Sequence, residues 1–493
     1  MRDSKKSHSL KSSPSRGGTK ISCITDPAAI AQTFHNLIES AQRQIIFQMY
    51  LFAGNGELET LQPKDGAFPW ARLFADWLIA RRKRSPDLTI AVLLDTQTPD
   101  DPRLTRLGRG PLARHVLEEA GIPVLNANLF DNTFNRARRF PAAARFHEKR
   151  RHSVAPERWV QAQQRWQLAH NVEDHRKNIV IDQGAWGAIT SHNAIDIASD
   201  WHENMFLIGE GPASLALWEE GRSSLSRALE LPQRIDAGQR EQLLEICRLP
   251  AKSRDTKFIQ GPEQSVLRAL GDPFAIPEAR RGRVSLLSSK EILPCIIQAA
   301  DALGPGDSIR VASTYFSDAQ ALRAFASAAK RRVSVRILID DCAGLPLKPL
   351  LSLLLRTFVS LRCRAYGRRR EPEHLEVRVH RSLQQPMMHL KTAAFLGKER
   401  LLIGGQANYT PNSFSGAWLE TNLLVEESAA VGAFLEQFDD LWNKAEPLRP
   451  PEHVARSGFL SRTLRNMSEA GGRIRLNLLL GILGIFERFG IAP

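Results

Sequence analysis

The stretch that decides the fold is Asp174-His175-Arg176-Lys177-Asn178-Ile179-Val180-Ile181-Asp182. It contains a His-x-Lys pair, and its apolar centre is typical of a buried strand. Because side chains alternate along a strand, His175 and Lys177 are expected on the same face. An imidazole and an ammonium that project together can hold one phosphate: the lysine neutralises its oxygens while the histidine attacks phosphorus or protonates a leaving oxygen. Ser191-His192-Asn193 and then Glu203 follow this stretch.

A second histidine–lysine pair occurs in the later half, as His389-Leu390-Lys391. It precedes the segment Gly404-Gly405-Gln406-Ala407-Asn408 and then Glu420. One site assembled from both halves would place two imidazoles on opposite sides of a phosphorus atom, as an in-line displacement through a covalent intermediate requires. One such motif is a moderate signal, whereas two at matching places in the chain weigh strongly against chance.

The order of the predicted elements also repeats, since each half reads helix, apolar strand, helix, apolar strand. These elements are expected, in chain order, at about 28–42, 45–52, 70–82, 88–94, 292–303, 309–315, 319–330 and 333–338. In both halves the last strand runs into an aspartate, Asp95 or Asp340. Alternating helices and strands predict an α/β fold with a largely buried sheet, and the repeat favours an internal duplication over two unrelated segments.

With two His-x-Lys pairs, each followed by a small-residue-x-Asn element, the chain resembles the phospholipase D superfamily from about residue 28 to 442. The resemblance implies two α/β sandwich domains related by a pseudo-twofold axis, and a reaction without a metal ion or another cofactor. By analogy, His175 is expected to be the nucleophile and His389 the general acid, with the opposite assignment open. The glutamates are expected to orient the histidines. The resemblance assigns catalytic roles to His175, His389, Lys177 and Lys391, substrate binding to Asn193, Asn408 and Ser191, and supporting roles to Asp182, Glu203 and Glu420.

The second half departs from the family pattern at two positions. Leu396 stands where the motif has its aspartate, and Gln406 stands where a Gly-Ser-x-Asn element has its serine. The first half keeps both, as Asp182 and Ser191. We therefore expect the second half to be less well positioned, and a relative that binds phosphodiesters without cleaving them is the alternative.

Composition shifts along the chain predict its domain organisation. We expect a disordered basic tail at 1–20, a first phospholipase D-like domain at 21–254 with a basic insertion near 134–166, a linker at 255–283, a second such domain at 284–446, and a C-terminal extension with an apolar segment at 447–493.

The overall composition restricts the class of protein. With 43% hydrophobic and 24% charged residues among 493, the chain is typical of a folded protein rather than a disordered or fibrous one. The net charge of +14 favours anionic partners but does not choose between nucleic acid and acidic lipid. The five cysteines form neither a C-x-x-C pair nor a zinc-binding pattern. The early residues lack the apolar run of a secretory signal, so we expect a cytoplasmic protein.

Two segments bear on the substrate. The stretch 473–488 joins arginines to a short apolar run, which suits an anionic membrane surface but falls short of the ~20 residues that span a bilayer. A helix packed on the protein's own core is the alternative there. The basic, aromatic-containing insertion could meet acidic headgroups or nucleic acid, or form a solvated loop.

The first hypothesis for the function is therefore a phospholipase D or phosphatidyltransferase similar to cardiolipin synthase. It would act on a phospholipid or another phosphodiester, in the cytoplasm and peripherally on the inner face of the membrane. The alternatives are a metal-independent nuclease and a non-catalytic binder of nucleic acid or acidic lipid.

Overall fold

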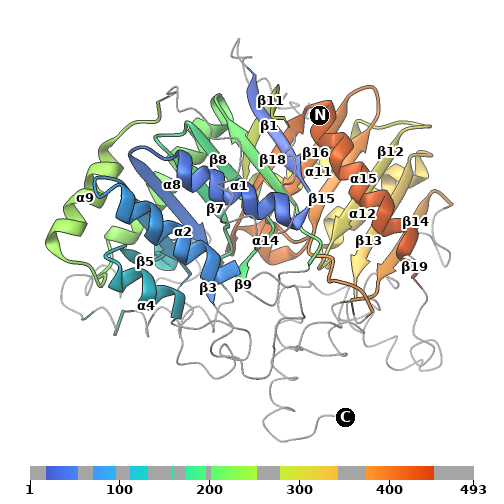
Figure 1. Cartoon of the computed structure of the whole chain (residues 1–493). Coiled ribbons are helices and arrows are strands. Elements are labelled where there is room, and N and C mark those ends of the chain that lie inside the picture. Colours follow the sequence, from blue (N-terminus) through green and yellow to red (C-terminus); the bar gives the residue numbers. More distant parts are fainter. Residues whose placement is uncertain are drawn as a thin grey trace, which may run out of the picture.

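A single sheet of fifteen strands runs through both halves of the chain in the computed structural model, as far as its residues are described (Figure 1). The structure describes residues 18–50, 52–53, 70–95, 112–131, 155, 158–159, 162, 172–195, 201–252, 278–341, 373–382 and 384–448.

The strands of this sheet come in nearly equal numbers from the two halves. The first half contributes β1 (Thr19–Ile24), β2 (Gln44–Met49), β4 (Thr89–Leu94), β5 (Val124–Asn126), β7 (Asn178–Ile181), β8 (Trp186–Thr190) and β10 (Met205–Gly209). The second contributes β11 (Arg280–Ser288), β12 (Ser308–Ser313), β13 (Ser334–Asp340), β14 (Leu375–His380), β15 (Lys391–Leu396), β16 (Arg400–Gly405), β18 (Thr421–Glu426) and β19 (Glu446–Pro447). Four short strands form two further pairs, β3 (Phe52–Ala53) with β9 (Ala194–Ile195) and β6 (Glu173–Asp174) with β17 (Trp418–Leu419).

The strand order is similar on either side of the antiparallel pair β1–β11 at the middle of the sheet. The full order is β19-β14-β13-β12-β15-β16-β18-β11-β1-β10-β8-β7-β2-β4-β5. In each half, the strand after the histidine motif (β7 or β15) lies antiparallel to the hairpin strand that follows it (β8 or β16) and to an earlier buried strand (β2 or β12). The predicted α/β fold is confirmed, while the pseudo-twofold relation of two domains stays a prediction.

Helices cover both faces of the sheet. Successive residues of a strand point to opposite faces, and here they are buried in two different apolar clusters. The helices are α1 (Pro27–Ser40), α2 (Trp70–Arg84), α4 (Leu112–Glu119), α8 (Pro212–Leu229), α9 (Ala237–Arg248), α11 (Ser289–Asp301), α12 (Ala319–Lys330), α14 (Pro411–Ser415) and α15 (Ser428–Lys444). On β2, Ile45 and Phe47 pack toward α1 and α2, whereas Ile46 packs with α8. That second cluster also takes in α15 and Leu402, so one apolar core joins the halves.

The expected helices and strands within the described ranges are confirmed to within a few residues, but two segment boundaries are corrected. β1 begins at Thr19, inside the expected tail, and β11 begins at Arg280, inside the expected linker. Charged residues made the two strands look like parts of the tail and of the linker. Lys20 lies in β1, and Arg281 and Arg283 lie in β11. In the structure the two arginine side chains lie at the surface, where they form ion pairs with Glu210 and Glu426 at 2.9 Å.

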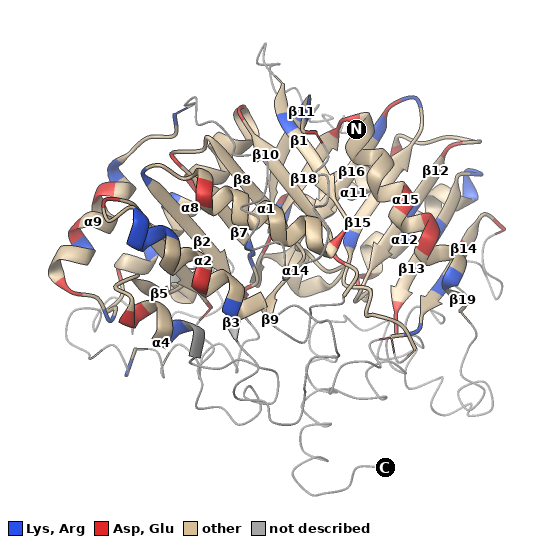
Figure 2. Cartoon of the chain, in the orientation of Figure 1, with Lys and Arg blue, Asp and Glu red and all other residues tan. Residues whose placement is uncertain are grey.

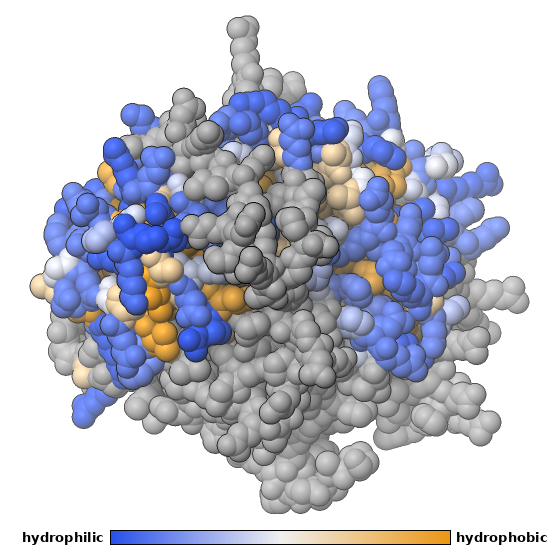
Figure 3. Space-filling view, in the orientation of Figure 1, coloured by the Kyte–Doolittle hydropathy of each residue, from blue (hydrophilic) through white to orange (hydrophobic). Residues whose placement is uncertain are grey.

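The charged residues are concentrated on the outer helices and turns, and the sheet between them is largely free of charge (Figure 2). The described surface in view is mostly hydrophilic, with some apolar side chains visible around α2 and α4 (Figure 3). Within the described ranges, no helix combines the length and apolar character needed to cross a bilayer. Most of the basic insertion and all of the C-terminal apolar segment lie outside the described residues.

Candidate functional site

Both histidines of the predicted pair lie just before a strand, not on one. His175 and Lys177 precede β7, and His389 precedes β15, which begins at Lys391. The prediction that alternation along one strand aligns the first pair is therefore wrong. The residues before β7 pair with the other half of the chain instead of extending β7. β6 pairs with β17, and the backbone N–H of His175 donates to the carbonyl of Leu419 at 3.0 Å.

Each imidazole is held by a glutamate from the opposite half. The Nδ1 atom of His175 lies 2.9 Å from Oε2 of Glu420, and Nδ1 of His389 lies 2.7 Å from Oε1 of Glu203. Both glutamate side chains are fully buried. A carboxylate bonded to Nδ1 keeps the proton on that nitrogen and leaves Nε2 to react.

The two lysines lie beside the histidines as expected. Lys177 Nζ donates to the carbonyl oxygen of His175 at 2.6 Å, and Lys391 Nζ makes the same bond to His389 at 2.6 Å. Lys177 also lies over the ring of Tyr50, at 5.0 Å from its centroid. Burial lowers the pKa of Lys177 to about 8, although Glu420 opposes the shift. At neutral pH its ammonium remains charged and can neutralise an anion.

The electrostatics indicate a shared site. Burial lowers the pKa of His389 to about 4; the positive charges of Lys391 and, from the other half, Lys177 lower it further, while Glu203 opposes the shift. Burial would raise the pKa of Glu203, but His389 and Lys391 bring it to about 2. At neutral pH this pair is therefore a neutral imidazole on an ionised carboxylate.

The other histidine–glutamate pair has a different charge balance. Burial raises the pKa of Glu420 well above its ordinary value, although Lys177 opposes the shift. The carboxyl groups of Glu420 and Glu203 are thus in unequal electrostatic environments despite their matching hydrogen bonds to histidine.

The two predicted asparagines lie buried, and the Oδ1 atoms of Asn193 and Asn408 are without a hydrogen-bond partner among the described residues. Such orphaned polar atoms are typical of a site that a ligand completes. Ser191, which we predicted to bind substrate, donates its hydroxyl to Glu203. It lies behind the carboxylate that holds His389.

The serine missing from the second motif is replaced from another element. Ser413 on α14 donates its hydroxyl to Oε1 of Glu420 at 2.8 Å, so both glutamates receive a serine hydroxyl. Sequence reasoning missed Ser413 because it lies seven residues beyond Gln406 and outside the motif. Gln406 itself crosses to the first half, where its amide donates to the carbonyl of Lys177 at 2.9 Å. Glu420 therefore still accepts a serine hydroxyl, although the second motif has Gln406 in place of its serine.

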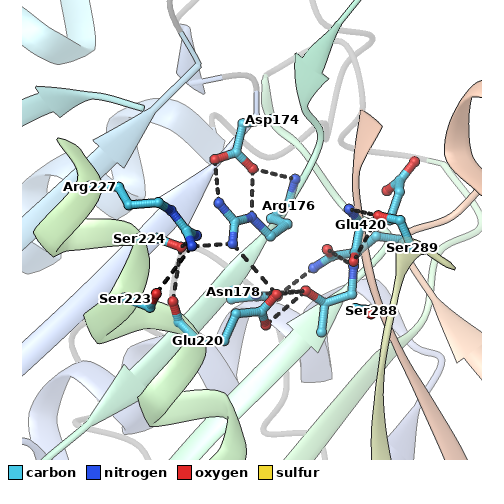
Figure 4. A network of polar contacts seen from close by, with 12 residues as sticks. Asp174, Arg176, Asn178, Glu220, Ser223, Ser224, Arg227, Ser288, Ser289 and Glu420 are labelled. Atoms are coloured by element: carbon cyan, nitrogen blue, oxygen red, sulfur yellow. Dashed lines mark hydrogen bonds and ion pairs between the residues drawn. The ribbon is translucent and has the colours of Figure 1, made fainter. Parts of the chain in front are cut away.

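A buried polar network connects the first histidine segment with the residues around Glu420, which lies between β17 and β18 (Figure 4). Arg176 donates two hydrogen bonds of 2.7 Å to Asp174 and one of 2.7 Å to Ser224 on α8. Its guanidinium also lies 3.5 Å from Glu220, which accepts the hydroxyl of Thr421 at 2.8 Å. Thr421 directly follows Glu420, so the network ties the His175 segment to its partner glutamate.

Asp182 stabilises the fold away from the histidines. Its carboxylate accepts the backbone N–H groups of Gln42 and Arg43 at 2.8 Å and of Gln44 at 3.1 Å, which orders the turn between α1 and β2. In the second half Leu396 faces Ser308, and the corresponding turn is closed by a bond from Gly304 N–H to Asp307 at 2.8 Å. The loss of the aspartate at Leu396 is therefore offset locally.

Two further aspartates that end strands position the histidine segments. Asp95, after β4, accepts the N–H of Asp174 at 2.8 Å, and Asp340, at the end of β13, accepts the N–H of Met388 at 2.8 Å. Asp174 and Met388 are the residues directly before His175 and His389. The repeated strand ending in Asp was visible in the sequence, but its link to the histidines was not.

Comparison with known proteins agrees with this geometry. Residues 295–442 match the family model described as the phospholipase D-like domain of cardiolipin synthase. The second half of the chain carries a phospholipase D-like domain. The resemblance to the phospholipase D superfamily is thereby confirmed. A search of curated protein sequences finds no match to the chain.

A solved structure extends the likeness in fold to both halves of the chain. Phosphatidylserine synthase of Haemophilus influenzae Rd KW20 superposes over 94% of this chain and 97% of its own length, with a TM-score of 0.58 and 12% identity. Nuc of Salmonella typhimurium, a phospholipase D family member, covers 34% of this chain and 99% of its own, with a TM-score of 0.27 and 19% identity. At 12% identity the likeness to phosphatidylserine synthase concerns the fold alone.

Proposed function

We propose that this protein exchanges or hydrolyses the phosphodiester bond of a phospholipid through a phosphohistidine intermediate. The observation that carries the proposal is the reciprocal pairing of His175 with Glu420 and of His389 with Glu203. Each half alone lacks the carboxylate that orients its histidine, so the reactive unit is the pair of halves. Two oriented imidazoles beside two buried lysines match the needs of phosphoryl transfer.

In the first step, Nε2 of one imidazole attacks phosphorus and an N–P bond forms. The bond from phosphorus to the leaving oxygen breaks, and that oxygen takes a proton from the second imidazole. In the second step, a hydroxyl group gives its proton to the second imidazole and attacks phosphorus, and the N–P bond breaks. Water as the acceptor gives hydrolysis, and an alcohol gives transfer. Lys177 and Lys391 would neutralise the non-bridging oxygens throughout.

The charge balance favours His389 as the nucleophile and His175 as the acid. A nucleophilic imidazole must be neutral, and the low pKa of His389 meets this need at neutral pH. His175, the other imidazole of the site, then takes the role of the acid that protonates the leaving oxygen. This assignment is the opposite of the one expected by analogy from the sequence.

The preference for a lipid substrate draws on the comparisons. The matching family model is described as a cardiolipin synthase domain, and the fold neighbour that spans most of the chain is a phosphatidylserine synthase. A peripheral position on an anionic membrane surface agrees with the net charge of +14. The lipid is therefore best sought among acidic phospholipids, and the acceptor among water and small alcohols.

The test uses purified protein in EDTA with two substrates, labelled phosphatidylglycerol in vesicles and labelled single-stranded DNA. Wild type is compared with His175→Ala, His389→Ala and the control His115→Ala, a substitution at an exposed residue of α4. We expect products from the lipid with wild type and the control, and at least a thousandfold less with either of the other two variants. Cleavage of DNA alone would establish the nuclease alternative, and binding without turnover the non-catalytic one.

A further inference from the structure

In each half, one Trp-x-Glu segment ends on the glutamate that holds a histidine. These two segments are Trp201-His202-Glu203 and Trp418-Leu419-Glu420. The histidine–lysine motifs do not include these segments.

All three positions of each segment contact the histidine of the opposite half. The glutamate binds Nδ1. The carbonyl of the middle residue accepts the backbone N–H of the histidine, at 3.0 Å from Leu419 to His175 and at 2.9 Å from His202 to His389. The tryptophan packs beside the imidazole ring itself. One short segment thus fixes the backbone, the ring nitrogen and the ring face of a single imidazole.

The indole contacts are similar in distance in the two halves. The ring centroids of Trp418 and His175 are 5.3 Å apart with an interplanar angle of 31°, and those of Trp201 and His389 are 5.1 Å apart with an angle of 60°. Aromatic rings at such separations attract one another and restrict each other's rotation. His175 also meets Tyr50, at 4.5 Å on another side.

We propose that Trp201 and Trp418 are positioning residues, each of which holds the catalytic imidazole of the opposite half with its Nε2 directed at the phosphorus. The proposal rests on the function proposed above. A hydrogen bond at Nδ1 alone leaves the ring able to rock about that bond, and the indole removes this freedom. It also covers the ring against reagents from solvent. The effect crosses between the halves: Trp418 acts on His175, and Trp201 acts on His389.

The first experiment needs no substrate. Diethylpyrocarbonate acylates accessible imidazole nitrogens, and peptide mass spectrometry gives the rate at each histidine. In Trp418→Leu we expect His175 to react several times faster and His389 to keep its rate, with the reverse in Trp201→Leu. The matched control is Trp186→Leu, because Trp186 is a buried tryptophan at the start of β8 and packs near Lys20 and Gly209, away from both histidines.

The second experiment measures turnover of the lipid substrate by the same variants. Loss of one aromatic contact should lower kcat about tenfold in each leucine variant, with KM changed less than twofold. Trp→Phe at each position should restore most of kcat and the slow acylation, because a ring face remains. A lack of turnover by wild type would refute the proposed function but leave the acylation pattern as a separate result.

Three results would overturn the positioning role. They are an equal rise in acylation at both histidines in both leucine variants, phenylalanine variants as reactive as the leucine ones, and a control variant that behaves like them.

Discussion

Replacing Glu203 by glutamine removes the charge behind His389 while keeping the shape of the side chain. The bond from Nδ1 to Oε1 is 2.7 Å long, and the carboxylate is fully buried. A hydrogen bond to a charged group contributes about 1.5–3 kcal/mol, and each 1.4 kcal/mol changes a rate about tenfold. We therefore expect kcat/KM to fall roughly 10- to 100-fold. The negative charge of Glu203 raises the pKa of His389, so its removal should lower that pKa further below about 4.

The assay is the pH dependence of kcat/KM for lipid turnover, together with the melting temperature of each variant. The acid limb, where His389 becomes protonated, should move to lower pH in Glu203→Gln. Glu210→Gln is the matched control, because Glu210 makes exposed ion pairs with Lys20 and Arg281 and lies outside the site. A folded Glu203→Gln protein with kcat/KM within twofold of wild type would refute the role given to the crossed pairs.

Three further predictions follow from particular contacts. Asp182→Ala leaves three backbone N–H groups without their acceptor and should lower the free energy of unfolding by about 2–5 kcal/mol in urea, with kcat/KM of the folded fraction little changed. Ser413→Ala removes one bond to Glu420 and should lower kcat about 3- to 10-fold without loss of binding, measured as a split between kcat and KM. Because the folded pKa of His389, about 4, lies below the unfolded value near 6.5, its contribution to stability is present above pH 6.5 and is lost as pH falls toward 4. Chemical unfolding across this range should show a slope of about 1.4 kcal/mol per pH unit from this group, and His389→Asn should remove it.

Much of the fold was predictable because the decisive signals are local. The apolar strand 178–181 and the amphipathic helices have clear periodicity, and their positions were confirmed. The strands at Thr19 and Arg280 were missed, since their pairing with each other at the sheet centre involves residues more than 250 positions apart. Pairing over such a separation leaves no local pattern to read.

The candidate site was predictable as a set of residue types but not as an arrangement. The motifs named His175, His389 and both lysines, and the structure brings all of them to the junction of the halves. The crossing of glutamates, the substitution of Ser413 for the serine absent at Gln406, and the tryptophan contacts depend on how the halves pack. The sequence contains these residues, but it does not show which half of the protein each side chain contacts.

Mapping the covalent intermediate would show directly whether a histidine takes up the phosphoryl group during turnover. Wild-type protein mixed with phosphorus-labelled lipid, quenched in alkali within a turnover and digested, would show by mass spectrometry which histidine carries the phosphoryl group. We predict an adduct on His389 that accumulates when His175 is replaced by alanine and is absent in His389→Ala. Turnover by wild type with no adduct on either histidine, or undiminished turnover by both alanine variants, would contradict the claim.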